Sequence, residues 1–405
     1  MSVLGDAREI AGELQQLRHA LHEEPEIGLT LPRTQEKVLR ALEGLPLQIT
    51  TGRRTTSVTA VLRGAESARN GGRAPVVLLR GDMDALPVQE LVDVPFRSRI
   101  DGVMHACGHD LHTSMLVGAA QLLSGRREQL RGDVVFMFQP GEEGWDGAAV
   151  MIDEGVLDAA GRRADAAFGM HVFSGLEPHG RFFTKPGPML AASDELHVTV
   201  QGAGGHGASP HLARDPVPAA AEMVTALHTM VSRKFDVFDP VLVTVGLLRA
   251  GTKANVIPDT AAFQATVRTY SRESRDRVRE EAPRLVRGIA AAHGLDVTVD
   301  YVAQYPMTVN DAGETEFATE VIADLFGKER NGRMAHPWGV AEDFSRVLDQ
   351  VPGSFIGLSA IPPGGDPATA AFNHSPHARF DDAVLPDGAA LYAELALRRL
   401  QRLCP

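Results

Sequence analysis

Short, continuous apolar runs alternate with helix-like segments through the first half of the sequence. The apolar runs lie at 76–79, 134–138 and 166–172, and the helix-like segments lie at 111–123 and 148–157. Strands that are apolar along their whole length and separated by helices are typical of mostly parallel sheets covered by helices on both faces. We therefore predict an α/β fold whose chemistry lies beyond the carboxyl ends of these strands.

The middle of the chain has a different pattern. Its predicted order is strand, helix, strand, strand, helix, strand, at 195–200, 216–232, 241–248, 261–269, 271–292 and 296–302, with a kink expected at Pro283. This order is typical of a ferredoxin-like α+β domain. We place it at 190–306, inserted into a catalytic domain of 1–189 and 307–405. Helices at 314–326, 341–348 and 383–403 and a strand at 354–358 would complete the catalytic domain.

The predicted helix at 216–232 has apolar residues on two sides. One side carries Val217, Ala220, Ala221, Val224, Leu227 and Val231, and the opposite side carries Ala219, Met223, Ala226 and Met230. Packing on one sheet needs only one apolar stripe. The second stripe would contact another part of the chain or a second copy. We favour a homodimer formed through the inserted domain, because two-fold dimers are the commonest assembly.

Charge and composition exclude several classes of function. Asp and Glu number 52 against 40 Lys and Arg, which gives a net charge of −12. Nucleic acids and anionic membranes are therefore poor partners. We see no apolar run near the ~20 residues of a membrane span and no export leader. With only two cysteines, we expect a cytoplasmic protein without disulfides.

Potential metal ligands follow the predicted strands. They are Cys107, His109, the Glu142-Glu143 pair and His171, with His374 far downstream. Thiolate, imidazole and carboxylate together favour zinc or a similar divalent ion. Cys107 and His109 are two residues apart, so they point the same way in an extended segment. Adjacent glutamates in a turn point in different directions, which suits one metal ligand and one proton acceptor.

A nucleophilic role for Cys107 is the competing interpretation. This role needs a histidine base and an orienting group. His109 is too close to Cys107 in sequence to be a well-placed base. It also leaves Glu142 and Glu143 unexplained. We assign no function to the remaining histidines of these motifs, which are His19, His22, His105, His112 and His377.

Two motifs carry a family resemblance: His-Ala-Cys-Gly-His-Asp at 105–110 and Gln-Pro-Gly-Glu-Glu at 139–143. They resemble the metal-dependent amidohydrolases of the hippurate hydrolase, aminoacylase and auxin-conjugate hydrolase group. Glutamate carboxypeptidases and succinyl-diaminopimelate desuccinylase are more distant relatives. The resemblance covers nearly the whole chain, through motifs at 21–26, 80–87, 204–211, 254–258, 341–344 and 374–376.

The resemblance implies two divalent metal ions and a general acid–base. The implied ligands are Cys107, His109, Glu143, His171 and His374, with the thiolate shared, and zinc is favoured over manganese, cobalt or nickel. Glu142 would transfer protons, and Asp84 would orient a ligand. Asp82 stands where the carboxypeptidase branch has a histidine ligand, and Cys107 and His171 replace carboxylates of that branch. These departures match the hippurate hydrolase branch.

The resemblance also assigns residues in the inserted domain. His206 would stabilise the tetrahedral oxyanion, in dimeric relatives from the other subunit. Asn255 and Arg268 would hold the substrate backbone and its free carboxylate, to which a planar guanidinium binds through two hydrogen bonds.

We therefore expect an enzyme that hydrolyses an N-acyl amino acid to a carboxylic acid and a free amino acid. A dipeptidase or carboxypeptidase with the same metal site is the nearest alternative. A binding protein that has kept the fold and lost turnover is the alternative from another class.

Overall fold

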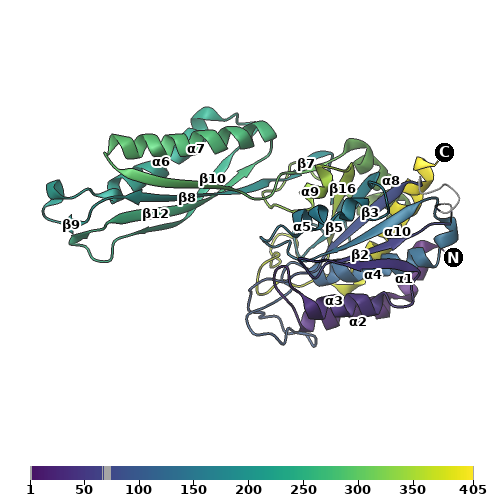
Figure 1. The fold of residues 1–405 in the computed structure, drawn as a ribbon. Coiled ribbons are helices and arrows are strands. Elements are labelled where there is room, and N and C mark those ends of the chain that lie inside the picture. Colours follow the sequence, from purple (N-terminus) through teal and green to yellow (C-terminus); the bar gives the residue numbers. More distant parts are fainter. Residues whose placement is uncertain (1, 66, 68–73, 405) are drawn as a thin grey trace. The chain divides into compact units, whose positions relative to one another are not determined.

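The computed structural model describes residues 2–65, 67 and 74–404, which form two compact units (Figure 1). The first unit is Met1–Met189, Val309–His336 and Asp343–Pro405, and the second is Leu190–Thr308 and Pro337–Glu342. The second unit begins where the predicted insertion begins. It also takes up 337–342, which the predicted division assigns to the catalytic domain.

An eight-stranded sheet forms the centre of the first unit. Its middle strands β4, β3, β5 and β16 are parallel, whereas β1 and β2 are antiparallel neighbours at one edge. The strand order is β1 (Leu47–Thr51), β2 (Val58–Leu62), β4 (Asp133–Gln139), β3 (Val76–Asp82), β5 (Ala166–Phe173), β16 (Gly353–Ser359), β6 (Phe182–Thr184) and β15 (Asn331–Arg333). The predicted α/β class with a mostly parallel sheet is confirmed.

Helices of the first unit cover the sheet. The long helices α4 (His109–Ser124) and α10 (Leu385–Leu403) contact each other and β3. Their apolar side chains share one core with Phe136 and Phe138 of β4 and Phe168 of β5, so helices and strands form a continuous packed layer. The other helices are α1 (Val3–Glu9), α2 (Ala11–Glu23), α3 (Pro32–Ala41), α5 (Gly147–Asp153), α8 (Ala312–Phe326) and α9 (Ser345–Leu348).

Two predicted helices have different bounds in the structure. The helix predicted at 341–348 is wrong in its first half, because α9 begins only at Ser345. The preceding Asp343 instead accepts hydrogen bonds from Arg80, Gln139 and the Ala148 N–H. The helix predicted at 148–157 is also too long: α5 ends at Asp153, and a separate 3-10 turn covers Val156–Asp158.

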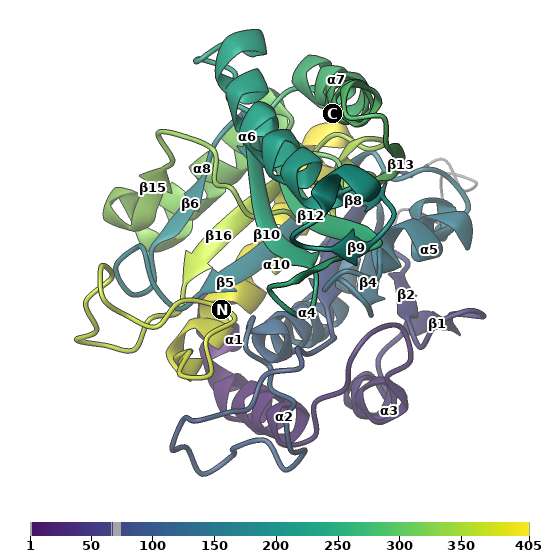
Figure 2. The same ribbon diagram turned by 90° about the vertical axis from the view of Figure 1, so that its left-hand side faces the viewer.

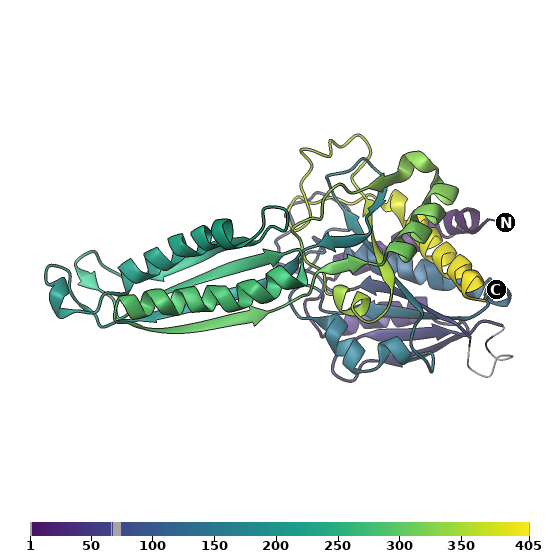
Figure 3. The same cartoon turned by 90° about the horizontal axis from the view of Figure 1, so that it is seen from above.

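The second unit is a four-stranded antiparallel sheet with two helices on one face (Figures 1 and 2). Its strand order, β10-β12-β8-β13, is that of a ferredoxin-like fold. The strands are β8 (Ala192–Gln201), β10 (Leu242–Ala250), β12 (Thr260–Thr269) and β13 (Asp296–Ala303). Helices α6 (Pro216–Lys234) and α7 (Arg272–Ala292) lie side by side along the strands (Figure 3), and α7 continues through Pro283.

Two pairs of short strands complete the description. One pair is β9 (Gly205–His206) with β11 (Val256–Ile257), and the other is β7 (Gly187–Leu190) with β14 (Thr308–Asn310). The second pair contains two of the four passages of the chain between the two units, at 189–190 and 308–309; the other two lie at 336–337 and 342–343.

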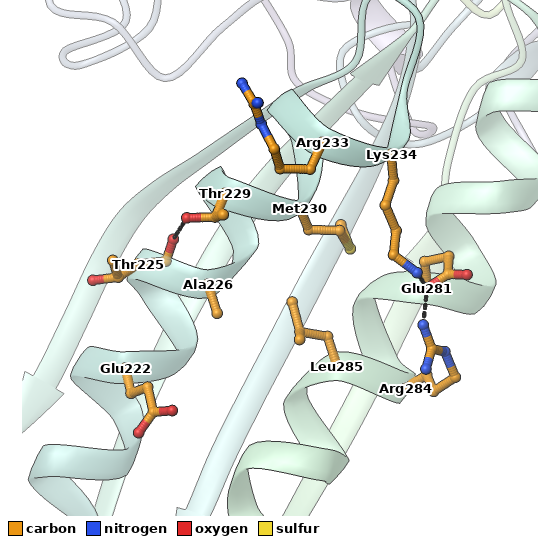
Figure 4. Close-up of a pocket in the computed structure, with 10 residues that line it drawn as sticks. All are labelled: Glu222, Thr225, Ala226, Thr229, Met230, Arg233, Lys234, Glu281, Arg284 and Leu285. Atoms are coloured by element: carbon orange, nitrogen blue, oxygen red, sulfur yellow. Dashed lines mark hydrogen bonds and ion pairs between the residues drawn. The ribbon is translucent and has the colours of Figure 1, made fainter.

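The apolar residues of α6 are distributed differently from the two predicted stripes. The buried arc lies between the stripes and contains Ala219, Ala220, Met223, Leu227 and Met230. On one flank, Ala226 faces α7 across a groove of about 410 Å³ (Figure 4). On the other flank, Val217 and Ala221 are exposed. The prediction of a whole second stripe is therefore wrong, and only one narrow apolar flank of α6 has no cover within its unit.

Among the residues that the structure describes, no helix combines the length and the apolarity of a membrane span.

Candidate metal centre

The five predicted ligands converge at the carboxyl ends of the central strands in the first unit. His171 lies in β5, and Glu143 follows β4. His109 begins α4, Cys107 lies two residues before it, and His374 lies in the segment between β16 and α10. The sulfur of Cys107 is 3.4 Å from Nε2 of His171 and 3.3 Å from Nε2 of His374. Oε1 of Glu143 is 3.2 Å from Nε2 of His374 and 4.0 Å from Nε2 of His109.

These side chains form two overlapping groups that share Cys107. The ligand atoms of Cys107, His109 and His171 lie within 4.8 Å of one another, and so do those of Cys107, Glu143 and His374. A thiolate common to two triads is the arrangement that would bridge two cations. The same cysteine–histidine proximity would also suit a nucleophilic thiol, but that interpretation gives Glu143 and His109 no role.

The donor set fits divalent metal ions. Among the described residues, Nε2 of His109 and Oε1 of Glu143 are buried atoms that make no hydrogen bond, although Oε1 forms an ion pair with His374. Buried polar atoms are normally paired, so these two point to a missing partner. Contacts with Cys107 and Glu143 raise the pKa of His374 to about 10. Burial opposes protonation of His109, yet Asp82 and Asp84 hold its pKa well above the usual value. The electrostatic field that retains a proton here also favours a metal cation.

Asp84 organises this centre from behind the ligands. Its carboxylate accepts the backbone N–H groups of Glu142, at 2.9 Å, and of Glu143, at 3.1 Å. Its carbonyl oxygen lies 2.9 Å from Nδ1 of His109. Because a carbonyl only accepts, Nδ1 donates to it, and Nε2 is the ring nitrogen that faces the site.

Glu142 lies beside the ligands. It is 6% exposed, and its carboxylate oxygen groups with ligand atoms of His109 and Glu143 within 4.8 Å. Gly141 and Gly144 flank the two glutamates with φ of 73° and 83°. This left-handed turn lets the two adjacent side chains diverge while Asp84 holds both backbones.

Asn373, which directly precedes the motif at 374–376, is a positioning residue. Its side-chain amide donates to the carbonyls of Cys107 and Val172, and its oxygen accepts from the Ser174 N–H. It thereby ties the Cys107 segment to the end of β5. The next residue, His374, has a left-handed φ of 71°, and its N–H bonds to Ala106. Such backbone strain persists only where the surroundings fix it.

Gly108 permits the close approach of these segments. It has a φ of 84°, and a Cβ at this position would lie 2.3 Å from Cγ2 of Val172. Only glycine therefore fits between Cys107 and His109.

The predicted substrate-binding residues lie in the second unit. His206, in β9, is exposed, and its Nδ1 accepts from the Ala208 N–H. Asn255 is its neighbour, since the Asn255 carbonyl accepts from the Gly207 N–H. Arg268, in β12, is partly buried and donates to Ser193, Thr266 and the Gly339 carbonyl. The structure thus brings His206 and Asn255 together in one loop pair, separate from the strand that carries Arg268.

A buried charge cluster supports the first turn of α4. Asp110, next to His109, accepts from Nε of Arg18 at 2.8 Å and lies 2.8 Å from Nδ1 of His22. Nε2 of His22 is 3.2 Å from Glu90. Burial disfavours the ionised Asp110, but Arg18 and His22 together hold its pKa far below the usual range. His22 thus lies between two carboxylates, which favour its protonated form.

This arrangement predicts a pH-dependent contribution of His22 to stability. Burial lowers the pKa of His22, but Asp110 and Glu90 more than compensate and raise it above 6.5. Its contribution is fully present below the unfolded pKa and is lost as the pH rises through the folded pKa. We expect His22→Asn to lower the free energy of unfolding by about 1–3 kcal/mol at pH 6, and by clearly less at high pH, in urea titrations.

His105→Asn is the matched control for His22. Burial lowers the pKa of His105 to about 3, so its contribution does not fall as the pH rises. Equal losses for His22→Asn at both ends of the pH range would contradict a cationic His22.

Several known proteins are similar to this chain along nearly its whole length. N-acetylcysteine deacetylase of Bacillus subtilis (strain 168) is 36% identical over 388 residues, covering 96% of this chain and 97% of that protein. Hippurate hydrolase of Campylobacter jejuni is 33% identical over 405 residues, covering 99% and 100%. Other matches bear the names IAA-amino acid hydrolase and thermostable carboxypeptidase.

A solved structure resembles the chain along its length. The YXEP protein of Bacillus subtilis, described as a dinuclear metal binding peptidase from the M20 family, has a TM-score of 0.81 and 32% identity. The match covers 97% of this chain and 99% of that one. The sequence profile of peptidase family M20/M25/M40 matches residues 78–398. The chain therefore belongs to peptidase family M20/M25/M40, as its motifs predict, and is one of that family's metal-dependent amidohydrolases.

Proposed function

We propose that this enzyme hydrolyses the amide bond of N-acyl amino acids, releasing a carboxylic acid and a free amino acid. The observation that carries the proposal is the pair of ligand groups sharing Cys107 beside Glu142. The names of its relatives, among them N-acetylcysteine deacetylase and hippurate hydrolase, support this substrate class. We also propose a cytoplasmic location, in keeping with its two unpaired cysteines.

The chain's own residues would divide the work as follows. Cys107, His109, Glu143, His171 and His374 would hold two divalent ions, with zinc the favoured metal for this donor set and manganese, cobalt or nickel as alternatives. Bound ions would polarise the amide carbonyl and lower the pKa of water. Glu142 takes a proton from the attacking water and delivers it to the leaving nitrogen as the C–N bond breaks. Asp84 keeps Glu142 and His109 in place for this transfer.

The second unit supplies the remaining groups in this proposal. His206 donates to the oxyanion that forms on the carbonyl carbon. Asn255 and Arg268 hold the amino-acid portion, Arg268 through the free carboxylate.

A panel of substrates tests the proposed class. We expect hydrolysis of N-acetyl-leucine or hippurate by metal-stripped protein resupplied with zinc, manganese, cobalt or nickel. Dipeptides with a free amine should be turned over at least tenfold less efficiently, as measured by kcat/KM. Preferred turnover of dipeptides would instead favour the dipeptidase or carboxypeptidase alternative. Absence of any turnover with every metal would favour a binding protein.

The two adjacent glutamates should respond differently to substitution. Glu142→Gln removes the proton acceptor and leaves the ligands intact, so we expect turnover to fall by at least 10²-fold while bound metal is retained. Glu143→Gln, the matched variant, should lose metal. Metal content by atomic emission and kcat by product assay separate the two effects. Loss of metal from Glu142→Gln alone would reverse the assignment.

We further propose that the protein is a homodimer formed through the second unit. Its sheet ends in β10, whose outer edge has no partner strand among the described residues. Leu242 and Leu248 on this strand are 47% and 54% exposed. The exposed flank of α6 adds Val217 and Ala221. Such an edge, with apolar side chains, is suited to pairing with a second copy.

Mixing two inactive variants tests whether the dimer is the catalytic unit. His206→Ala should lose about 2.7–4 kcal/mol of transition-state stabilisation, and Glu142→Gln should be nearly inactive. If His206 acts in the neighbouring subunit, random exchange makes about half of the protein heterodimeric, with one intact site in two. Roughly a quarter of wild-type activity should then return. A lack of recovery despite proven exchange would mean that His206 does not act across the dimer.

A further inference from the structure

His112 lies one turn after His109 in α4 and is fully buried, yet the sequence motifs assign it no function. Its Nε2 lies 2.7 Å from the backbone nitrogen of Val172 and accepts that N–H. Nε2 therefore carries a lone pair, and the proton of the neutral ring is on Nδ1. Nδ1 lies 2.5 Å from Oδ1 of Asp82, to which it donates. Both ring nitrogens are thus committed to protein partners.

Asp82 is fixed from its other side. Oδ2 accepts from Arg80, whose Nη1 is 2.5 Å away. The Arg80 guanidinium also donates to Gln139 at 2.9 Å and to Asp343 at 2.9 Å. All four of these side chains are completely buried. A continuous hydrogen-bonded chain therefore crosses the carboxyl ends of β4, β3 and β5 and ends at the N–H of Val172.

The peptide groups around Val172 determine where His171 points. The hydrogen bond to Nε2 of His112 holds the backbone N–H of Val172, which belongs to the peptide group between His171 and Val172. The Val172 carbonyl accepts from Nδ1 of His171, at 2.8 Å, and from the Asn373 amide, at 3.0 Å. These contacts leave Nε2 of His171 facing the sulfur of Cys107 at 3.4 Å. The rings of His112 and His171 also pack with their centroids 4.6 Å apart.

We propose that His112, anchored by Asp82, is a positioning residue that fixes the end of β5 so that His171 can bind metal. The inference rests on the metal site of the proposed function. It gives Asp82 a defined task in this chain: Asp82 anchors the histidine that positions a ligand. Asp82, His109 and His112 also form a group with ligand atoms within 4.8 Å of one another. Direct ligation by Asp82 or His112, however, would break bonds that both already make.

Two substitutions of His112 separate its two hydrogen bonds. His112→Gln can place an amide oxygen near the position of Nε2 and keep the bond to the Val172 N–H, while it loses the donor to Asp82. His112→Asn can keep a donor near the position of Nδ1 and loses the acceptor for Val172. Ser114→Ala is the matched control, because Ser114 is buried in the same helix and its hydroxyl bonds to the Asp110 carbonyl of its own turn.

Zinc affinity and stoichiometry, measured by chelator competition on metal-stripped protein, are the primary readouts. We expect His112→Asn to weaken one of the two zinc equivalents about 10–100-fold, the usual effect of removing a group that orients a ligand, and to lower kcat more than it raises KM. His112→Gln should weaken zinc binding clearly less than His112→Asn, because it keeps the bond to Val172 and loses only the anchor to Asp82, and Ser114→Ala should match the wild type. Wild-type affinity in His112→Asn would overturn the proposal. Equal weakening in both His112 variants would also overturn it, and complete loss of one equivalent in both would identify His112 as a ligand.

A measurement on the unsubstituted chain covers the case in which the variants fail to fold. In metal-free protein with ¹⁵N-labelled histidine, the His112 ring should show a protonated Nδ1 and an unprotonated Nε2 close to the Val172 amide proton. The opposite tautomer would overturn the proposal. Because this readout needs no metal and no substrate, it can hold even if the proposed activity fails. Wild-type protein that binds none of zinc, manganese, cobalt and nickel would instead refute the proposed function.

Discussion

The carboxylate of Asp84 is the interaction on which the candidate centre depends. By accepting two consecutive N–H groups it fixes the turn that carries Glu142 and Glu143, and its carbonyl fixes the ring of His109. One residue at the end of β3 therefore sets the positions of groups that come from two other segments. The parallel strands make this possible, because their carboxyl ends lie at a common edge of the sheet and bring the segments that follow them together.

Much of this arrangement could be predicted from the sequence. Continuous apolar runs predicted β3, β4 and β5, and the polar residues near their carboxyl ends, Asp84, Glu143 and His171, indicated where the site lies. In the second unit, alternating apolar residues predicted strands with one buried face, and the order of strands and helices along the chain predicted a ferredoxin-like domain. The family and its amidohydrolase class followed from motifs, and the comparisons confirm both. The ligand roles themselves remain predictions.

The residues that escaped prediction act through tertiary contacts. Arg80 and Asp343 are 263 positions apart in sequence, yet they meet in a fully buried ion pair. Nothing in the sequence distinguishes Asn373 from other loop residues. Only the structure shows that its amide joins Cys107 to the end of β5. The helix predicted at 341–348 was too long because Asp343, just before α9, accepts hydrogen bonds from residues far away in sequence. Local helix propensity carries no information about such contacts. The apolar stripes of α6 were misassigned for a related reason: α6 packs on the sheet and beside α7 at once, which moves its buried arc.

The buried carboxylates have a consequence for the life of this protein in a cell. Five carboxylates lie in one region: Asp82, Asp84, Glu142, Glu143 and Asp343. The guanidinium of Arg80 forms ion pairs with two of them, Asp82 and Asp343. Like charges in a poorly hydrated interior repel one another, so bound cations would add to the stability of the folded state by mass action. Metal-starved chains would then unfold more often and be degraded sooner. The abundance of the enzyme, as well as its activity, would follow the metal supply of its host.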